Sequence, residues 1–179
     1  MDADVSIEYA PLATAPFVVN EAAPIAAPIA AALVVDLGIW DVPSGKMGIT
    51  GAVRGWTARW DRTLDLDVRV WSAELDLFVR APTSEGFVSS WAGAGVGLRL
   101  GLLDTVWWDD VGTAGVGGWG GFGVVLGDGP VCATLSGRAS LSLDLDRWDG
   151  TVAASNETTT WSYWPGSARV SVLAGVAFR

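Results

Sequence analysis

Three pairs of aspartates are the side chains in this sequence most able to bind a metal ion or to transfer protons. They are Asp109-Asp110, Asp65 with Asp67, and Asp144 with Asp146. In a strand, the members of an i, i+2 pair lie on one face about 7 Å apart, and two such carboxylates could bind calcium. However, none belongs to a D-x-D-x-D-G loop, and the sequence lacks histidine, the commonest metal ligand and general base. We therefore predict no metal site, no cofactor and no catalytic residue, and we expect that the protein is not an enzyme.

Two further features also argue against cofactor chemistry. Cys132 is the only cysteine, which excludes an intrachain disulfide and a zinc cluster of thiolates. Glycine is densest in residues 112–123, where G-x-G spacings occur with no helical pattern after them and no P-loop lysine. The sequence therefore predicts a flexible loop here, or a strand that another backbone approaches closely, and not a nucleotide-binding loop.

Composition excludes other classes of function. Half of the 179 residues are hydrophobic, 17% are charged, and the net charge is -9. Negative charge opposes binding to a phosphate backbone, so nucleic acid is not an expected partner. The mean hydropathy of +0.37 indicates extra apolar surface that lipid or neighbouring subunits must cover. The longest apolar stretch, residues 22–35, contains Pro24 and Pro28 and is too short to span a membrane as a helix.

The segments that would position these side chains alternate with a period of two, as strands do. Apolar and small residues alternate with polar ones in residues 133–146 and again in 168–178. Turn-forming residues at 43–45, 82–86 and 127–130 separate such segments, and helical periodicity is nearly absent. We predict an all-β fold, either an antiparallel β-sandwich or a barrel, with about seven or eight strands.

Residues 1–30 differ from the rest of the chain. Four prolines interrupt an alanine-rich run, and repeated Ala-Pro steps favour an extended backbone. The apolar residues among them argue against a solvated linker. We predict an extended Pro/Ala-rich N-terminal arm over residues 1–30, lying on its own domain or on a neighbour, and an all-β domain over residues 31–179.

Tryptophan occurs 11 times, mostly near the expected strand ends. Such residues could close the end of a core, form an aromatic girdle at a membrane surface, or anchor an interface between proteins. Under the third interpretation, the candidate interface residues are Phe17, Ile25, Ile29, Trp40, Trp60, Trp107, Trp108, Trp119, Trp161 and Trp164.

Two functions agree with these features. The first is a non-enzymatic structural subunit of a virus or phage particle, a capsid-decorating or tail or neck component made in the host cytoplasm. Its partners would be copies of itself and other assembly proteins, held by hydrophobic interfaces and the arm. The alternative is a transmembrane β-barrel or porin of a bacterial outer membrane. The acidic start, Met1-Asp2-Ala3-Asp4, does not resemble a secretory signal, so the first function is preferred.

Short segments also resemble mycobacterial porins, in the same order along the chain. They are residues 95–97 (Gly-Val-Gly), 108–110 (Trp-Asp-Asp), 126–130 (Leu-Gly-Asp-Gly-Pro) and 150–156. This resemblance covers about a third of the chain, and it implies that Asp109 and Asp110 lie near a pore constriction.

Overall fold

The computed structural model describes residues 2–14, 17–19, 26–27, 30–59, 67–84, 86–105, 108–145, 149–154, 157–163 and 166–179. Side chains are described outside residues 11–30, 56–70, 103–111, 144 and 146–167. All regular secondary structure in this part of the chain is β-strand, which confirms the predicted all-β class. No helix long and apolar enough to cross a membrane occurs among the described residues.

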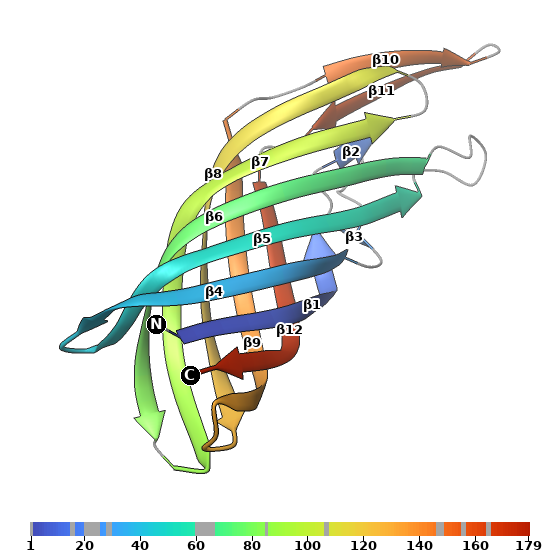
Figure 1. The fold of residues 1–179 in the computed structure, drawn as a ribbon. Helices are drawn as coiled ribbons and strands as arrows, with labels where there is room; N and C mark the ends of the chain where they lie inside the picture. The colour runs from blue at the N-terminus through green and yellow to red at the C-terminus, as the bar shows by residue number, and fades with distance from the viewer. Residues whose placement is uncertain are drawn as a thin grey trace.

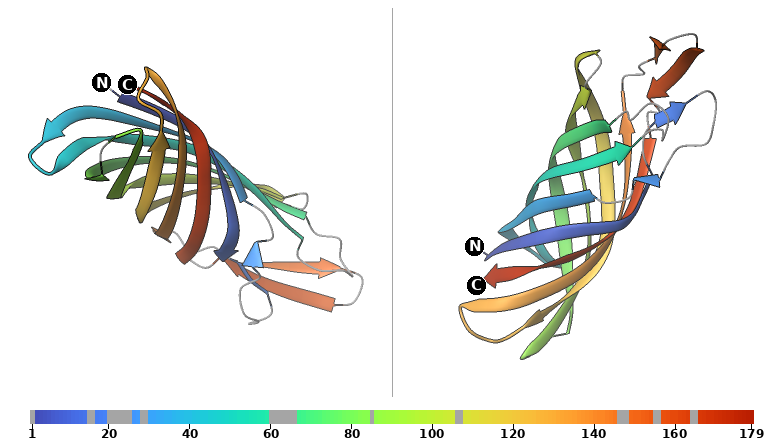
Figure 2. Two further views of the ribbon diagram at one scale, coloured as in Figure 1. Left: turned by 90° about the horizontal axis from the view of Figure 1, so that it is seen from below. Right: turned by 90° about the vertical axis from the view of Figure 1, so that its right-hand side faces the viewer.

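Eight long strands form one antiparallel sheet that closes on itself (Figures 1 and 2). Each strand pairs with the next barrel strand along the chain, and β12 closes the cylinder by pairing with β1. Of the two predicted architectures, the barrel is therefore the one that forms, and closure leaves no long edge strand open in it. The barrel strands are β1 (Asp2–Thr14), β4 (Ala30–Val42), β5 (Gly45–Arg59), β6 (Asp67–Ser84), β7 (Val88–Thr105), β8 (Trp108–Leu126), β9 (Val131–Asp144) and β12 (Gly166–Phe178).

The two ends of the barrel differ. At the end that holds both termini, called here the terminal end, the connections are short, at residues 43–44, 85–87 and 127–130. Each has a glycine with positive φ in it or next to it. Gly45 follows the first connection, Gly86 lies in the second, and Gly127 begins the third. At the opposite end, called the loop end, three of the four connections between barrel strands are longer, at residues 15–29, 60–66 and 145–165, and the fourth comprises residues 106–107.

A small second sheet lies at the loop end (Figure 1). It contains β10 (Asp149–Ala154), β11 (Glu157–Tyr163) and β2 (Phe17–Val19), in the order β10-β11-β2. The two-residue strand β3 (Ala26–Ala27) pairs with the last residues of β1. Segments from the first and last connections of the barrel are thus joined outside the cylinder.

The predicted N-terminal arm lies partly within the barrel. Residues 2–14 form β1, which pairs with β4 on one side and β12 on the other. Val5, Ile7 and Tyr9 face outward, while Ser6 and Glu8 face inward, so this segment has the same alternation as the other strands. The sequence analysis emphasised prolines and alanines and did not use this alternation. For the rest of residues 1–30, a separate arm stays a prediction.

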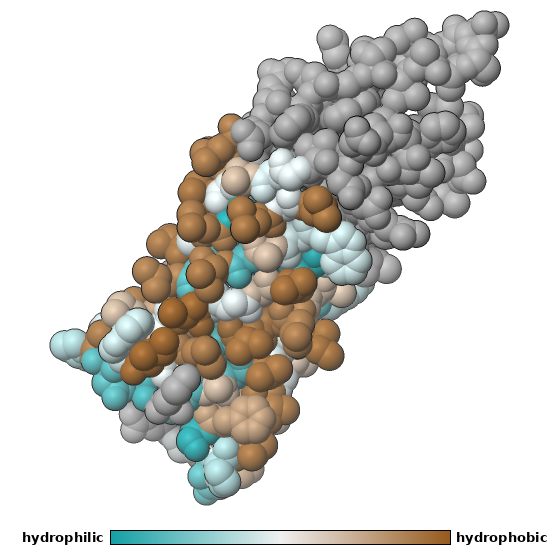
Figure 3. All heavy atoms as spheres, turned by 45° about the horizontal axis from the view of Figure 1, so that its top comes forward, coloured by the Kyte–Doolittle hydropathy of each residue, from teal (hydrophilic) through white to brown (hydrophobic). Residues whose placement is uncertain are grey.

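The two faces of the barrel have the reverse of the polarity of a water-soluble protein. Large apolar side chains lie exposed on the outer face, such as Leu98 at 64%, Leu77 at 58% and Leu141 at 69% exposure. Figure 3 shows hydrophobic residues over most of the visible wall of the barrel, with hydrophilic residues gathered at the terminal end. Charged side chains such as Glu8 and Arg54 are buried inside. A soluble fold places charge outside and apolar residues inside, so this outer face requires an apolar environment.

Glycines in the strands make room for aromatic side chains on the neighbouring strands. The closest cases are inside the barrel, where Trp91 lies opposite Gly123 and Trp119 lies opposite Gly95. A Cβ at Gly123 would lie 2.6 Å from the Trp91 ring, and one at Gly95 would lie 2.5 Å from Trp119 Nε1. The glycine-rich residues 112–123 therefore belong to strand β8, and several of these glycines are needed for packing.

Candidate functional site

One group of buried ion pairs joins four strands inside the barrel. Nε and Nη2 of Arg54 on β5 donate to Oε2 of Glu8 on β1, at 3.0 and 2.7 Å. Arg54 also pairs with Glu74 on β6. Arg169 on β12 completes the group, with its Nε 3.2 Å from Oε1 of Glu8. Each carboxylate in this group is shared by two guanidinium groups.

A second group lies nearer the terminal end. Asp36 on β4 accepts from Arg80 on β6 and Arg138 on β9, and it also accepts from Oγ1 of Thr50 at 2.6 Å. Arg80 reaches Asp4 through Nη1 at 2.5 Å. The second group thus connects β1, β4, β5, β6 and β9.

Aromatic rings cover the guanidinium groups of the second group. The Cζ atom of Arg80 lies 4.2 Å from the centre of the Trp91 ring and 4.8 Å from that of Phe78. The Cζ atom of Arg138 lies 4.1 Å from the centre of the Trp119 ring. Such cation–π contacts stabilise a desolvated guanidinium, by about 2 kcal/mol where water is excluded.

Acidic and basic side chains balance inside the barrel. Among the side chains that the structure describes there, Asp4, Glu8, Asp36, Glu74 and Asp76 face Arg54, Arg80, Arg99, Arg138 and Arg169. A buried charge without a partner costs several kcal/mol, so this balance is a condition for folding. An eight-stranded barrel has an interior that side chains can fill, and here ion pairs and aromatic rings fill the middle of it.

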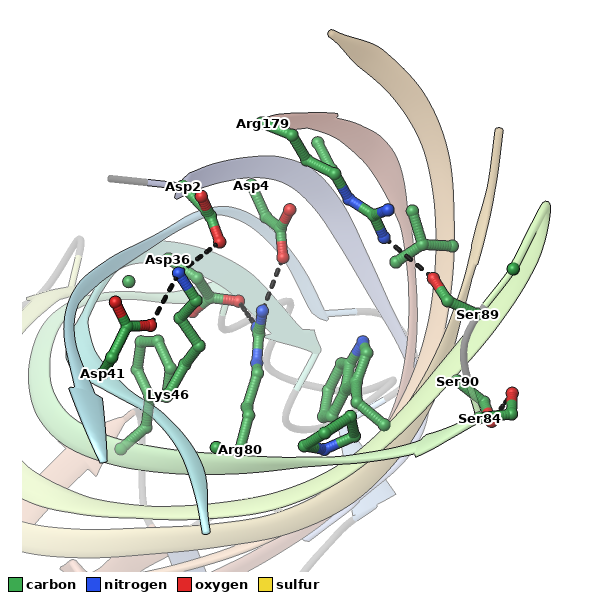
Figure 4. Close-up of a pocket in the computed structure, with 18 residues that line it drawn as sticks. Asp2, Asp4, Asp36, Asp41, Lys46, Arg80, Ser84, Ser89, Ser90 and Arg179 are labelled. Atoms are coloured by element: carbon green, nitrogen blue, oxygen red, sulfur yellow. Dashed lines mark hydrogen bonds and ion pairs between the residues drawn. The ribbon is translucent and has the colours of Figure 1, made fainter. Parts of the chain in front are cut away.

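A cavity of about 580 Å³ opens at the terminal end (Figure 4). Arg80, Phe78 and Trp91 line its inner part. Nearer the opening, Lys46 Nζ lies 3.0 Å from Asp2 Oδ2 and 3.0 Å from Asp41 Oδ1. Across the cavity, Nη2 of Arg179 donates to Oγ of Ser89 at 2.8 Å.

The residues singled out from the sequence do not form one site among the described side chains. Trp40 is exposed on β4 near the terminal end, while Trp119 is buried inside the barrel at 7% exposure and does not face outward. Phe17, Trp108 and Trp161 are described only as backbone positions in β2, β8 and β11. Ile25, Ile29, Trp60, Trp107 and Trp164 lie outside the described residues. Their role as interface residues stays a prediction.

The three aspartate pairs lie outside the described side chains, whereas Cys132 lies among them. No group of three or more potential metal ligands occurs among the described residues. The side chains of Asp109 and Asp110, for which the porin resemblance implied a pore constriction, are not described. Cys132 is a buried free thiol whose Sγ lies 3.2 Å from the carbonyl oxygen of Gly129.

Sequence reasoning missed the buried ion pairs. Arg54, Arg99, Arg138 and Arg169 each occupy the polar phase of an alternating segment, and that signal was present in the sequence. It was not assigned to either the inside or the outside of the fold. The alternation alone does not show which face of a strand is enclosed.

Comparisons with known proteins agree with the barrel architecture. No family model and no curated protein matches the chain. Among solved structures, the chain is similar to Neisserial surface protein A, with 12% identity and a TM-score of 0.54 over 98% of this chain and 96% of that one. It is also similar to Ail, the attachment invasion locus protein of Yersinia pestis, with 13% identity and a TM-score of 0.48 over 99% and 98%.

These findings correct the preferred functional prediction. The assignment to a virus or phage particle, as a capsid-decorating, tail or neck component located in the virion, is wrong. The fold is shared with a bacterial surface protein, and the apolar excess lies on the outer wall of a closed barrel. The predicted assembly partners have no support in these comparisons. The structure shows an eight-stranded closed barrel with an apolar outside and a charged inside, and the comparison with Neisserial surface protein A shows the same fold.

Proposed function

We propose that the protein is an integral β-barrel of a bacterial outer membrane, and that it acts as a non-enzymatic anchor with a filled interior. The observation that carries this proposal is the reversed polarity of the barrel wall, with Leu98 and Leu141 exposed outside and Arg54 buried inside. In water, each large apolar side chain left exposed lacks about 1.5–3 kcal/mol of the stabilisation that burial would give it. Lipid would cover all of these side chains. The similarity to Neisserial surface protein A supports the same conclusion.

The strand lengths support a membrane-spanning barrel. A tilted transmembrane strand needs about 9–11 residues, and the barrel strands here have 13 to 19. Outer-membrane barrels have short periplasmic turns and longer loops outside the cell. By that rule, the terminal end faces the periplasm and the loop end, with its small β-sheet, faces outward.

The filled interior supports an anchor in preference to a channel. Ion pairs between Arg54, Glu8 and Glu74 cross the middle of the barrel, and Trp119 and Arg138 fill the adjacent layer. Barrels of eight strands hold side chains in their interior, whereas an open aqueous channel is found in barrels of about 16–18 strands. The function would then depend on what the loop end presents at the cell surface.

Extraction and electrophoresis test the membrane assignment. The protein should require detergent for extraction, and the folded barrel should migrate differently on SDS gels before and after boiling. A monomer that stays dispersed in plain buffer, with no change in migration on boiling, would overturn the assignment.

Conductance in planar bilayers tests the filled interior separately. Reconstituted wild-type protein should show no steady ion conductance. Because the ion pairs block the lumen, the comparison variant is Arg54→Ala with Glu8→Ala, which removes two blocking side chains while keeping the charges balanced and should raise the conductance. Steady channels from the wild-type protein would show that it is a pore.

A further inference from the structure

The cavity at the terminal end has two chemically different walls. Figure 4 shows Asp2, Asp4 and Asp41 on one side, and Arg179 with Ser89 on the other. The acidic wall comes from β1 and β4, and the opposite wall from the end of β6, the start of β7 and Arg179, which follows β12. This separation of charge across one cavity indicates a ligand with charges of opposite sign at its two ends.

The acidic wall holds four carboxylates, and that of Asp41 is the most exposed of them. Asp36 pairs with Arg80 and Arg138, Asp4 pairs with Arg80, and Asp2 and Asp41 share Lys46. Asp41 is 84% exposed at its side chain, so it can accept a further hydrogen bond from a ligand. An ammonium group would therefore be attracted to this wall.

The opposite wall presents hydrogen-bond donors. Arg179 is exposed and uses Nη2 for Ser89, while the guanidinium has five N–H donors in all. Ser84 and Ser90 add hydroxyl groups, which also contact each other. A carboxylate is the ligand group that a guanidinium with neighbouring hydroxyl groups binds best.

We propose that this cavity binds a small zwitterion of the amino-acid or short-peptide class. Its amino group would lie against Asp2 and Asp41, and its carboxylate against Arg179 and Ser89. The cavity volume of about 580 Å³ falls in the usual range for small-molecule sites and would hold a di- or tripeptide. Phe78 and Trp91 give the inner part of the cavity an apolar surface for side chains of the ligand. The proposal rests on the cavity and does not depend on the membrane location.

An NMR titration in detergent micelles tests the site, with the dipeptide alanyl-alanine as the probe. Signals of Ser89, Asp41 and Arg179 should shift in a saturable manner. N-acetyl-alanyl-alanine and alanyl-alanine amide, which each lack one charge, should bind at least about threefold more weakly, as expected for one exposed ion pair. No saturable shift, or equal binding of the blocked dipeptides, would overturn the assignment.

Variants then assign the two walls. Asp41→Asn should weaken binding of alanyl-alanine but leave binding of its N-acetyl form unchanged, and Arg179→Gln should do the same for the amide form. Asp128→Asn is the matched control, because Asp128 is exposed at the terminal end and does not line the cavity. Heat-dependent migration on gels confirms that each variant is folded. Equal weakening by all three variants would contradict the proposed contacts.

Discussion

Arg54 and Glu8 are 46 residues apart in the sequence and form a two-bond contact inside the barrel, through Nε and Nη2 of the arginine. Both side chains are almost completely buried. The contact links β1 to β5 across the interior, past β4 that lies between them in the sheet. The contact therefore holds β1 and β5 together and also neutralises two buried charges.

Removal of one partner of this contact should be costly. Arg54→Met leaves Glu8 with Arg169 and leaves Glu74 without its Arg54 partner, and we expect a loss of about 3–5 kcal/mol in the free energy of unfolding. Urea unfolding in detergent micelles, followed by tryptophan fluorescence, measures this loss. Asp128→Asn at the exposed turn serves as the control and should change stability by less than about 0.5 kcal/mol. An Arg54→Met protein as stable as the wild type would show that the ion pairs do not hold the barrel together.

The glycines opposite buried tryptophans should not tolerate a methyl group. Gly123→Ala places a Cβ against the Trp91 ring, and Gly95→Ala places one against Trp119. We expect each to destabilise the barrel by about 1–3 kcal/mol, since overpacking forces neighbouring side chains from their rotamers. Gly120→Ala on the same strand as Gly123 is the control, because no atom lies within 4 Å of its Cβ position. Urea unfolding in detergent micelles measures the free energy of unfolding of all three variants. Equal losses for the control and for the two crowded positions would refute the packing argument.

A charge on the outer wall should be costly only in a membrane. Leu98→Arg changes a residue that is 64% exposed on β7, and in lipid we expect a loss of about 2–4 kcal/mol. Phe87→Arg is the matched control, since Phe87 is 66% exposed but lies in the turn at the terminal end. Folding yields into lipid vesicles, read from gel migration, should fall for Leu98→Arg alone. Equal yields for the two variants would argue against lipid as the environment of the outer wall.

Cys132 reports on closure of the barrel. Its side chain is buried beside Val125 and Ala177, so a maleimide reagent should label the folded protein slowly. Boiling in SDS should make labelling fast, and mass spectrometry counts the added groups. Rapid labelling of the unboiled protein would mean that the terminal end of the barrel opens readily.

The sequence predicted the strands well because alternation is a local property. Residues 133–146 and 168–178 were expected to alternate, and the described parts do so in β9 and β12. The same alternation results from an apolar face against a core or against lipid, so it did not decide between a particle subunit and a membrane barrel.

The candidate site was not predictable in the same way. Asp36 and Arg138 form a hydrogen-bonded ion pair although 102 residues separate them. Trp119 packs against Gly95 only because of the register between β7 and β8. Register depends on all the pairings around the cylinder, which no short window of sequence contains. The cavity follows from this register too, because its lining residues are spread along the chain from Asp2 to Arg179.

An even number of barrel strands returns the chain to the side from which it started, so residues 2 and 179 lie at the same end of the cylinder. A reporter protein fused to either extremity would therefore emerge in the same compartment. A reporter inserted between β5 and β6 would emerge in the opposite compartment. Fluorescent or enzymatic fusions of these two kinds would give opposite signals in intact cells.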